Sequence, residues 1–132
     1  MVMDTISDIL TRIRNATLVR HKTVMIPITK MSLAITIILK NEGFIHDFKS
    51  YNEGKNSYLL LSLKYSKVTH NSVITGIKRI SKPGLRVYKK LKDLPPILDN
   101  FGISILSTSK GIITNVKAKE LKVGGEVLCY IW

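Results

Sequence analysis

The strongest candidate for chemistry in this sequence is a run of five small polar residues between two apolar runs. It reads Ser107-Thr108-Ser109-Lys110-Gly111. Its three hydroxyl groups can donate and accept hydrogen bonds, its ammonium group adds positive charge, and its glycine permits a tight turn or a close backbone approach. These groups suit contact with a polar, anionic surface. The same composition is that of an ordinary turn, and the five residues alone favour the turn.

The charge of the chain indicates the class of its partner. Twenty-one basic residues oppose nine acidic ones, for a net charge of +12 over 132 residues. No acidic residue occurs between Asp8 and Glu42 or between Glu53 and Asp93, whereas basic residues occur throughout both tracts. Such tracts of one charge sign in an apolar-rich chain indicate that its binding partner is a polyanion, and nucleic acid is the commonest one. An anionic membrane surface is the alternative, but it favours a single amphipathic basic helix, which this sequence lacks.

Length and composition limit the size of the core, and the cysteine content indicates the cell compartment. A chain of 132 residues that is 45% hydrophobic can form one compact unit or two small lobes. The single cysteine, Cys129, cannot form an internal disulfide, and its apolar neighbours predict a buried residue in a reducing compartment. No apolar run reaches the ~18 residues of a membrane span, and we expect no signal peptide.

The N-terminal half predicts two helices and three strands. Apolar residues at helical spacing indicate the helices, and alternating apolar residues indicate the strands. Pro27 predicts an edge strand, Thr29 a helix start and Gly43 a helix end. The predicted elements are a helix over 5–20, a strand over 24–28, a helix over 30–42, and a hairpin of strands 44–51 and 57–65.

The C-terminal half predicts short strands and one short helix. The polar stretch 66–72 is the predicted lobe boundary, so we divide the chain into an N-terminal lobe, 1–68, and a C-terminal lobe, 69–132. The fold class is therefore α+β, with two small lobes, of which the second is mainly β. The predicted elements are strands 73–80 and 85–88 around the turn Ser81-Lys82-Pro83-Gly84, a helical turn over 97–102, a strand over 103–106, a helix over 115–122 capped by Thr114, and a strand over 126–132.

Two further groups of side chains are candidates for contact with nucleic acid. Arg86 and Tyr88 are expected on the same side of one strand, an arrangement that suits phosphates and exposed bases. A tyrosine that packs under a lysine-rich rim is the alternative. On the first helix, Arg12 and Asn15 are expected on one face with Arg14 at its flank, and a merely solvated face is the alternative.

Catalysis has little support. Lys110 follows two hydroxyl residues, but the glycine spacing of a phosphate-binding loop is missing. One cysteine and three dispersed histidines cannot supply a closed zinc site. Asp4 and Asp8 are one helical turn apart and have no third partner that would suggest acid–base work. We therefore expect no enzymatic activity, no cofactor and no metal. The alternative function is that of a DNA-binding nucleoid-type protein. The positive charge would suit it, but this sequence shows no recognisable recognition helix.

The chain resembles the family of the eighth protein of the small ribosomal subunit, nearly from end to end. Each matching motif is moderately specific alone, and their joint order and spacing make the resemblance strong. The motifs are residues 8–15 (DILTRIRN), 42–45 (EGFI), 79–88 (RISKPGLRVY), 107–111 (STSKG) and 124–130 (GGEVLCY).

The resemblance implies an α+β fold of two lobes and a structural function without catalysis. It also implies direct binding to the central domain of small-subunit ribosomal RNA, a role in platform assembly and contacts with neighbouring ribosomal proteins. By position, the three hydroxyl residues would bond bases and sugars, Tyr88 would pack on a base or ribose, and Glu126 would accept from a base or brace the loop. The residues expected to bind RNA are Thr11, Arg14, Asn15, Lys82, Pro83, Gly84, Arg86, Tyr88, Ser107, Thr108, Ser109, Lys110, Gly111, Gly124, Gly125 and Glu126.

Departures from the family pattern refine these expectations. Lys82 stands where many relatives carry arginine, and Lys110 varies with arginine. Lysine lacks the bidentate fork of arginine, so both are expected on phosphates rather than bases. The ending 128–132 resembles plastid-encoded members, and the composition, with 18 Ile and 16 Lys against 5 Arg and 3 Ala, fits an AT-rich source. We therefore expect a ribosomal protein of the plastid stroma, with the cytoplasm of an AT-rich bacterium as the alternative.

Overall fold

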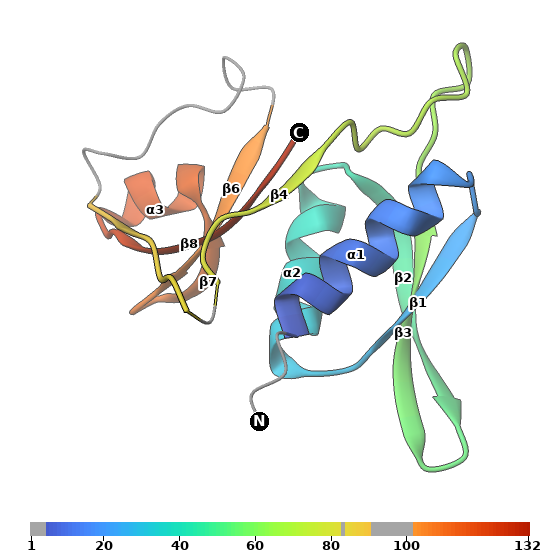
Figure 1. The fold of residues 1–132 in the computed structure, drawn as a ribbon, viewed down its shortest axis with the longest axis horizontal. Helices are drawn as coiled ribbons and strands as arrows, with labels where there is room; N and C mark the ends of the chain where they lie inside the picture. The colour runs from blue at the N-terminus through green and yellow to red at the C-terminus, as the bar shows by residue number, and fades with distance from the viewer. Residues whose placement is uncertain (1–4, 83, 91–101) are drawn as a thin grey trace. The chain divides into compact units, whose positions relative to one another are not determined.

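The computed structural model describes residues 5–82, 84–90 and 102–132, which form an α+β fold of three helices and eight strands (Figure 1). The α+β class is confirmed. The chain divides into an N-terminal unit, Thr5–Thr75, and a C-terminal unit that runs from Gly76 to Trp132. The sequence places the boundary at residue 68. The polar stretch belongs to the first unit because the Val73 amide donates to the carbonyl of Lys64, at 3.0 Å.

The N-terminal unit has the predicted order of helix, strand, helix, strand and strand. Its three strands form an antiparallel sheet in the order β1-β3-β2. Pro27, in β1, lies on an edge as predicted, because a central position would need its missing amide donor. The elements are α1 (Thr5–Leu18), β1 (Thr23–Pro27), α2 (Lys30–Asn41), β2 (Ile45–Glu53) and β3 (Asn56–Leu63).

The apolar pattern of the sequence explains how this unit packs. Leu59, Leu61 and Leu63 are buried on one face of β3, as their alternation predicts. The two helices cover one face of the sheet (Figure 1). Burying one such side chain stabilises the fold by about 1.5–3 kcal/mol, so the helical stripe accounts for the position of α1. That stripe consists of Ile6, Ile9, Leu10, Ile13 and Ala16.

The second helix begins and ends where the sequence predicts. The Thr29 hydroxyl accepts from the Ser32 amide at 2.9 Å, and the Ser32 hydroxyl accepts from the Thr29 amide at 2.7 Å, which forms a capping box. Gly43 follows the helix with φ +81°, where a side chain would be strained. Leu33 and Ile37 remain 39% and 41% exposed, so this largely apolar helix is not wholly buried.

The C-terminal unit is built around its last strand, β8. The sheet order is β4-β8-β6-β7, β5 also pairs with β8, and every pairing is antiparallel. Cys129 lies fully buried in β8, as predicted, and burial raises the pKa of its thiol to about 12. The elements are β4 (Ile77–Arg79), β5 (Tyr88–Lys89), β6 (Ile103–Thr108), β7 (Gly111–Thr114), α3 (Asn115–Leu121) and β8 (Gly125–Ile131).

Three predictions for the C-terminal half are corrected. The strand predicted over 73–80 is confined to 77–79, because the amide of Ile74 bonds to the Ser72 hydroxyl at 3.1 Å instead of to a neighbouring strand. The strand predicted over 85–88 begins only at Tyr88 and runs to Lys89, because Leu85 bonds back to Lys82. The strand predicted over 103–106 is β6 and ends at 108 rather than at 106.

Two helical predictions in this half have different outcomes. Helix α3 begins at the predicted cap, where the Thr114 hydroxyl accepts from the Lys117 amide at 3.2 Å. It ends at Lys122, which takes the left-handed conformation (φ +57°) that glycine usually supplies. The helical turn predicted over 97–102 lies outside the described residues, apart from Gly102.

Candidate nucleic-acid interface

The five-residue polar run forms the end of a β-hairpin. Thr108 pairs with Gly111 across β6 and β7, which leaves Ser109 and Lys110 at the turn. The Thr108 hydroxyl donates to the Gly111 carbonyl at 2.9 Å and accepts from the Lys110 amide at 3.0 Å. Gly111 has φ +102°, a conformation that other residues rarely adopt. The run is therefore a turn, and it holds Ser109 and Lys110 in exposed positions.

The sheet brings three predicted site residues into one row. Glu126 in β8 pairs with Ser107 of β6 on one side and with Tyr88 of β5 on the other. Residues paired across antiparallel strands share a face of the sheet, with Cβ atoms ~5 Å apart. A tyrosine, a carboxylate and a hydroxyl therefore lie side by side at the end of the sheet beside the hairpin.

A glycine makes this row close-packed. A Cβ atom added to Gly125 would lie 2.3 Å from the Ser107 carbonyl oxygen and 2.8 Å from Cγ2 of Thr108. Neither distance leaves room for a methyl group. Gly125 thus allows β8 to approach the hydroxyl end of β6, which is a reason for glycine at this position that the sequence alone does not supply.

Glu126 and Arg86 form an ion pair beside this row. One Arg86 guanidinium nitrogen donates to Oε2 of Glu126 at 3.1 Å. The carboxylate side chain is 13% exposed and that of Arg86 is 48% exposed. The carboxylate is thus partly shielded from water, and the guanidinium keeps an open side.

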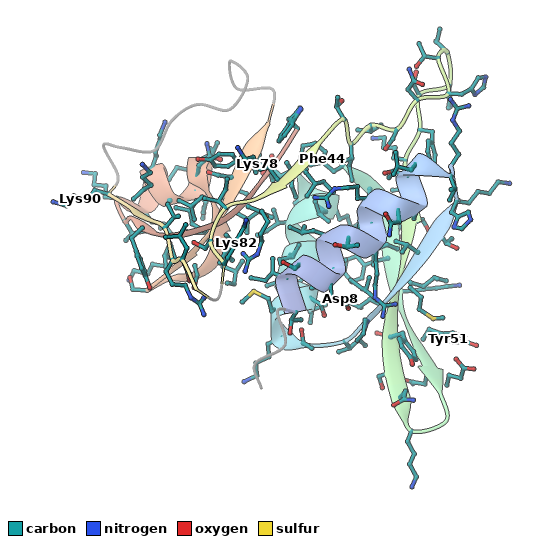
Figure 2. The ribbon with its side chains drawn as sticks, in the orientation of Figure 1. Asp8, Phe44, Tyr51, Lys78, Lys82 and Lys90 are labelled. Carbon is teal, nitrogen blue, oxygen red and sulfur yellow. The ribbon has the colours of Figure 1, made fainter. Side chains whose placement is uncertain are left out.

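Next to the row is an open hollow that the sequence did not reveal. Its volume is about 540 Å³, and it is lined by the exposed ring of Tyr88, the lysines at 89, 90 and 122, and Gly124 with Gly125. Lys90 points outward from this unit (Figure 2). Lys90 and Lys122 were absent from the predicted site. Lys122, in a left-handed conformation directly after α3, lines the hollow together with the residues of β5. No local sequence pattern indicates that these two segments meet.

The remaining predicted residues fall in two other places. Lys82 and Gly84 are exposed in the turn before Arg86, and Pro83 lies outside the described residues. Thr11, Arg14 and Asn15 are exposed on one face of α1, three and four residues apart, and belong to the N-terminal unit. That helix also holds Arg12, which is tied to Asp8 at 3.1 Å.

Positive charge dominates the described part of the C-terminal unit. Its two acidic residues are both paired, Glu126 with Arg86 and Glu120 with Lys117, the latter at 3.6 Å. A polyanion would therefore meet little repulsion here. Within the described residues, no group of His, Cys, Asp and Glu side chains could hold a metal ion, and no helix is long and apolar enough to cross a membrane. The basic residues are Lys78, Arg79, Lys82, Arg86, Lys89, Lys90, Lys110, Lys117, Lys119 and Lys122.

A two-unit α+β chain with excess positive charge and a hydroxyl-rich hairpin has the features of a nucleic-acid-binding protein. The chain belongs to the ribosomal protein S8 family, whose family model matches residues 4–132. It is 65% identical to the small ribosomal subunit protein uS8c of Phaeodactylum tricornutum and 63% identical to that of Trieres chinensis, in each case over the whole of both chains. It is 57% identical to the uS8 protein of Gloeothece citriformis, over 98% of this chain and 97% of that one.

Membership of this family defines the class of function. The family is a structural, non-enzymatic component of the ribosome, so the chain is a structural protein of the small subunit and not an enzyme. The prediction of a plastid-encoded ribosomal protein is confirmed by the plastid-encoded relatives in diatoms and algae. The alternative of a DNA-binding nucleoid-type protein receives no support.

Proposed function

We propose that the chain binds the central domain of small-subunit ribosomal RNA directly and supports assembly of the platform beside neighbouring ribosomal proteins. The observation that carries this proposal is the row of Tyr88, Glu126 and Ser107 at the hydroxyl end of a strongly basic sheet. A row of ring, carboxylate and hydroxyl offers stacking and hydrogen bonds, and the surrounding lysines offer charge.

The size of the side chains suits RNA. A regular RNA helix hides its major groove, so sequence is read through the shallow minor groove or at irregular positions. The short hydroxyl side chains of Ser107 and Ser109 can enter such a groove. The longer side chains of Lys82 and Arg86 reach phosphates, which set affinity and orientation rather than sequence. On the other unit, Thr11, Arg14 and Asn15 would contact phosphates in the same way.

A salt titration tests the proposal. Filter binding compares an RNA fragment from the central domain with an unrelated hairpin of equal length. We expect tighter binding to the central-domain fragment, and log affinity should fall with log salt by about 0.7 to 0.9 per phosphate contact. Replacing ribose by deoxyribose should weaken binding, because contacts to the 2′-hydroxyl are lost. Equal affinity for both RNAs would contradict the proposal.

Two variants separate reading from charge. Ser109→Ala should weaken binding to the central-domain fragment by roughly 1–3 kcal/mol, because it leaves an RNA group unpaired. Lys89→Ala should weaken binding to both RNAs alike and reduce the salt slope by about one contact. If both variants gave the same pattern, the hydroxyl hairpin would not be the reader.

A further inference from the structure

The basic turn before Arg86 is a loop that leaves the edge of the sheet and returns to the same point. The amide of Ser81 donates to the carbonyl of Val127 at 3.1 Å, and the amide of Val127 donates to the carbonyl of Val87 at 2.8 Å. Both ends of the loop are therefore held by one residue of β8. The described residues between them, Lys82 and 84–86, are exposed, while the hydrogen bonds along β8 continue on either side.

A single hydroxyl group closes the base of this loop. The Ser81 hydroxyl accepts from the Val87 amide at 2.8 Å and lies 3.3 Å from the Val87 carbonyl, to which it donates. Ser81 is fully buried. Above it, Lys82 and Leu85 exchange two backbone bonds, of 2.8 and 2.9 Å. The serine side chain thus takes the place of a backbone pair between the strands of the loop.

The loop presents two cations from this base. Lys82 and Arg86 are both exposed, and the Arg86 guanidinium is paired with Glu126 of β8. A loop of this kind has many conformations when its base is open, and ordering them on binding weakens affinity. The buried hydroxyl removes that freedom before RNA arrives.

We propose that Ser81 is a positioning residue for RNA binding, which fixes the loop so that Lys82 and Arg86 meet neighbouring phosphates together. The inference rests on the proposed function. Ser81 itself is buried and touches no RNA. Its effect passes through the two cations, and this distinguishes it from a residue that only stabilises the fold.

Ser81→Ala is the first test. We expect affinity for the central-domain RNA and for the unrelated hairpin to fall about tenfold, and the salt slope to fall by about one contact, because the two cations no longer act together. Ser104→Ala is the matched control. Ser104 is also a buried serine of this sheet, and its hydroxyl has no hydrogen-bond partner among the described residues, so affinity and slope should stay unchanged.

A double-mutant cycle makes the test independent of general stability. In a Lys82→Ala/Arg86→Ala background, Ser81→Ala should cause no further loss of RNA affinity, since the side chains it positions are gone. The same tenfold loss in both backgrounds would overturn the proposal. If Ser81→Ala does not fold, Ser81→Cys, which fills a similar volume with a weaker donor, replaces it in the same cycle.

The outcomes separate this inference from the proposed function. Wild-type protein without preference for central-domain RNA would contradict the proposed function. Wild-type preference together with an additive effect of Ser81 would contradict the positioning role alone. Wild-type preference, loss in Ser81→Ala and no further loss in the background without the two cations would support both.

Discussion

The two units carry the same number of basic residues, ten each among the described residues, yet they are built differently. Of the twelve largest fully buried side chains in the described part of the chain, nine lie in the N-terminal unit and three in the C-terminal unit. The N-terminal unit is therefore held mainly by aliphatic packing between two helices and a sheet. Positive charge alone does not tell the two apart.

In the C-terminal unit, polar contacts fix the segments that carry the candidate site. The Ser81 hydroxyl closes a loop, the Thr108 hydroxyl closes a turn, and the buried Asn115 side chain accepts from the Ser104 amide at 3.2 Å. Such bonds are directional, so each fixes the position of the segments that it joins. Under the proposed function, the charge of both units would attract RNA, whereas the polar geometry around the hairpin and the Ser81 loop of the second unit would read it. Four predictions test this contrast.

The largest effect is expected from a core substitution in the N-terminal unit. Leu61→Ala empties a fully buried position of β3 and should lower the free energy of unfolding by about 2–5 kcal/mol. Leu60→Ala, on the half-exposed opposite face, should cost less. Denaturant unfolding measures both. RNA affinity, corrected for the folded fraction, should stay at the wild-type value in each. A specific loss of affinity in Leu61→Ala would break the division of roles.

The next effect is expected at the close approach of β8 to β6. Gly125→Ala places a methyl group against the Ser107 carbonyl and should destabilise the protein by about 1–3 kcal/mol. RNA affinity should fall as well, since the methyl group would displace Ser107 from its row with Glu126 and Tyr88. For comparison, Gly84→Ala meets no atom within 4 Å, and its stability should match the wild type. Thermal unfolding and filter binding test both variants, and an unchanged affinity in Gly125→Ala would contradict the reading of this row.

A smaller effect is expected from the ion pair beside the row. Glu126→Gln should cost about 1 kcal/mol of stability, as for a partly exposed pair. Its main use is to decide whether the carboxylate braces Arg86 or accepts from a base. If it braces, Glu126→Gln should have no further effect on RNA affinity in an Arg86→Ala background. A full effect there would show that the carboxylate meets the RNA itself.

The smallest effect is expected from a surface pair of the N-terminal unit. The Lys40 ammonium lies 3.0 Å from Asp47, and its hydrogen bond, with help from the Phe48 amide, holds the carboxyl pKa below the ordinary 3.8. Because the folded pKa is lowered, the stabilisation is present above the ordinary pKa and lost as pH falls through the folded value. Asp47→Asn should lower the midpoint of thermal unfolding slightly above that acid range, and so make the midpoint depend less on pH across it. The difference from the wild type should be largest at neutral pH and should vanish at the acid end of the range, so a difference that persists there would contradict the role of this pair.

The same contrast explains how much could be predicted from the sequence. Apolar patterns placed α1, β1, α2 and β3, because packing against a common core imposes such patterns, and the hairpin turn over 52–56 placed β2. In the C-terminal unit, the strand predicted over 85–88 begins only at Tyr88, because the Ser81 side chain bonds to Val87 where a backbone pair would otherwise form. Lys122 takes a left-handed turn without glycine.

The sequence predicted which residues belong to the candidate site better than it predicted how they are arranged. Tyr88, Ser107 and Glu126 were identified by resemblance, and the sheet pairs them in one row. Their adjacency depends on strands that lie far apart in the sequence, which no local pattern records. Lys90 and Lys122 were missed for the same reason.

The position of β8 has a consequence for the order in which the protein forms during synthesis. Every strand of the N-terminal unit is complete by Leu63, so its sheet can form as soon as that unit has emerged. In the C-terminal unit, β4, β5 and β6 all pair with β8, which follows them in the chain. Until residues 125–131 are made, those strands have open edges and no shared partner. The row of Tyr88, Glu126 and Ser107 is therefore completed only when β8 has been made, and a nascent chain without β8 lacks that row.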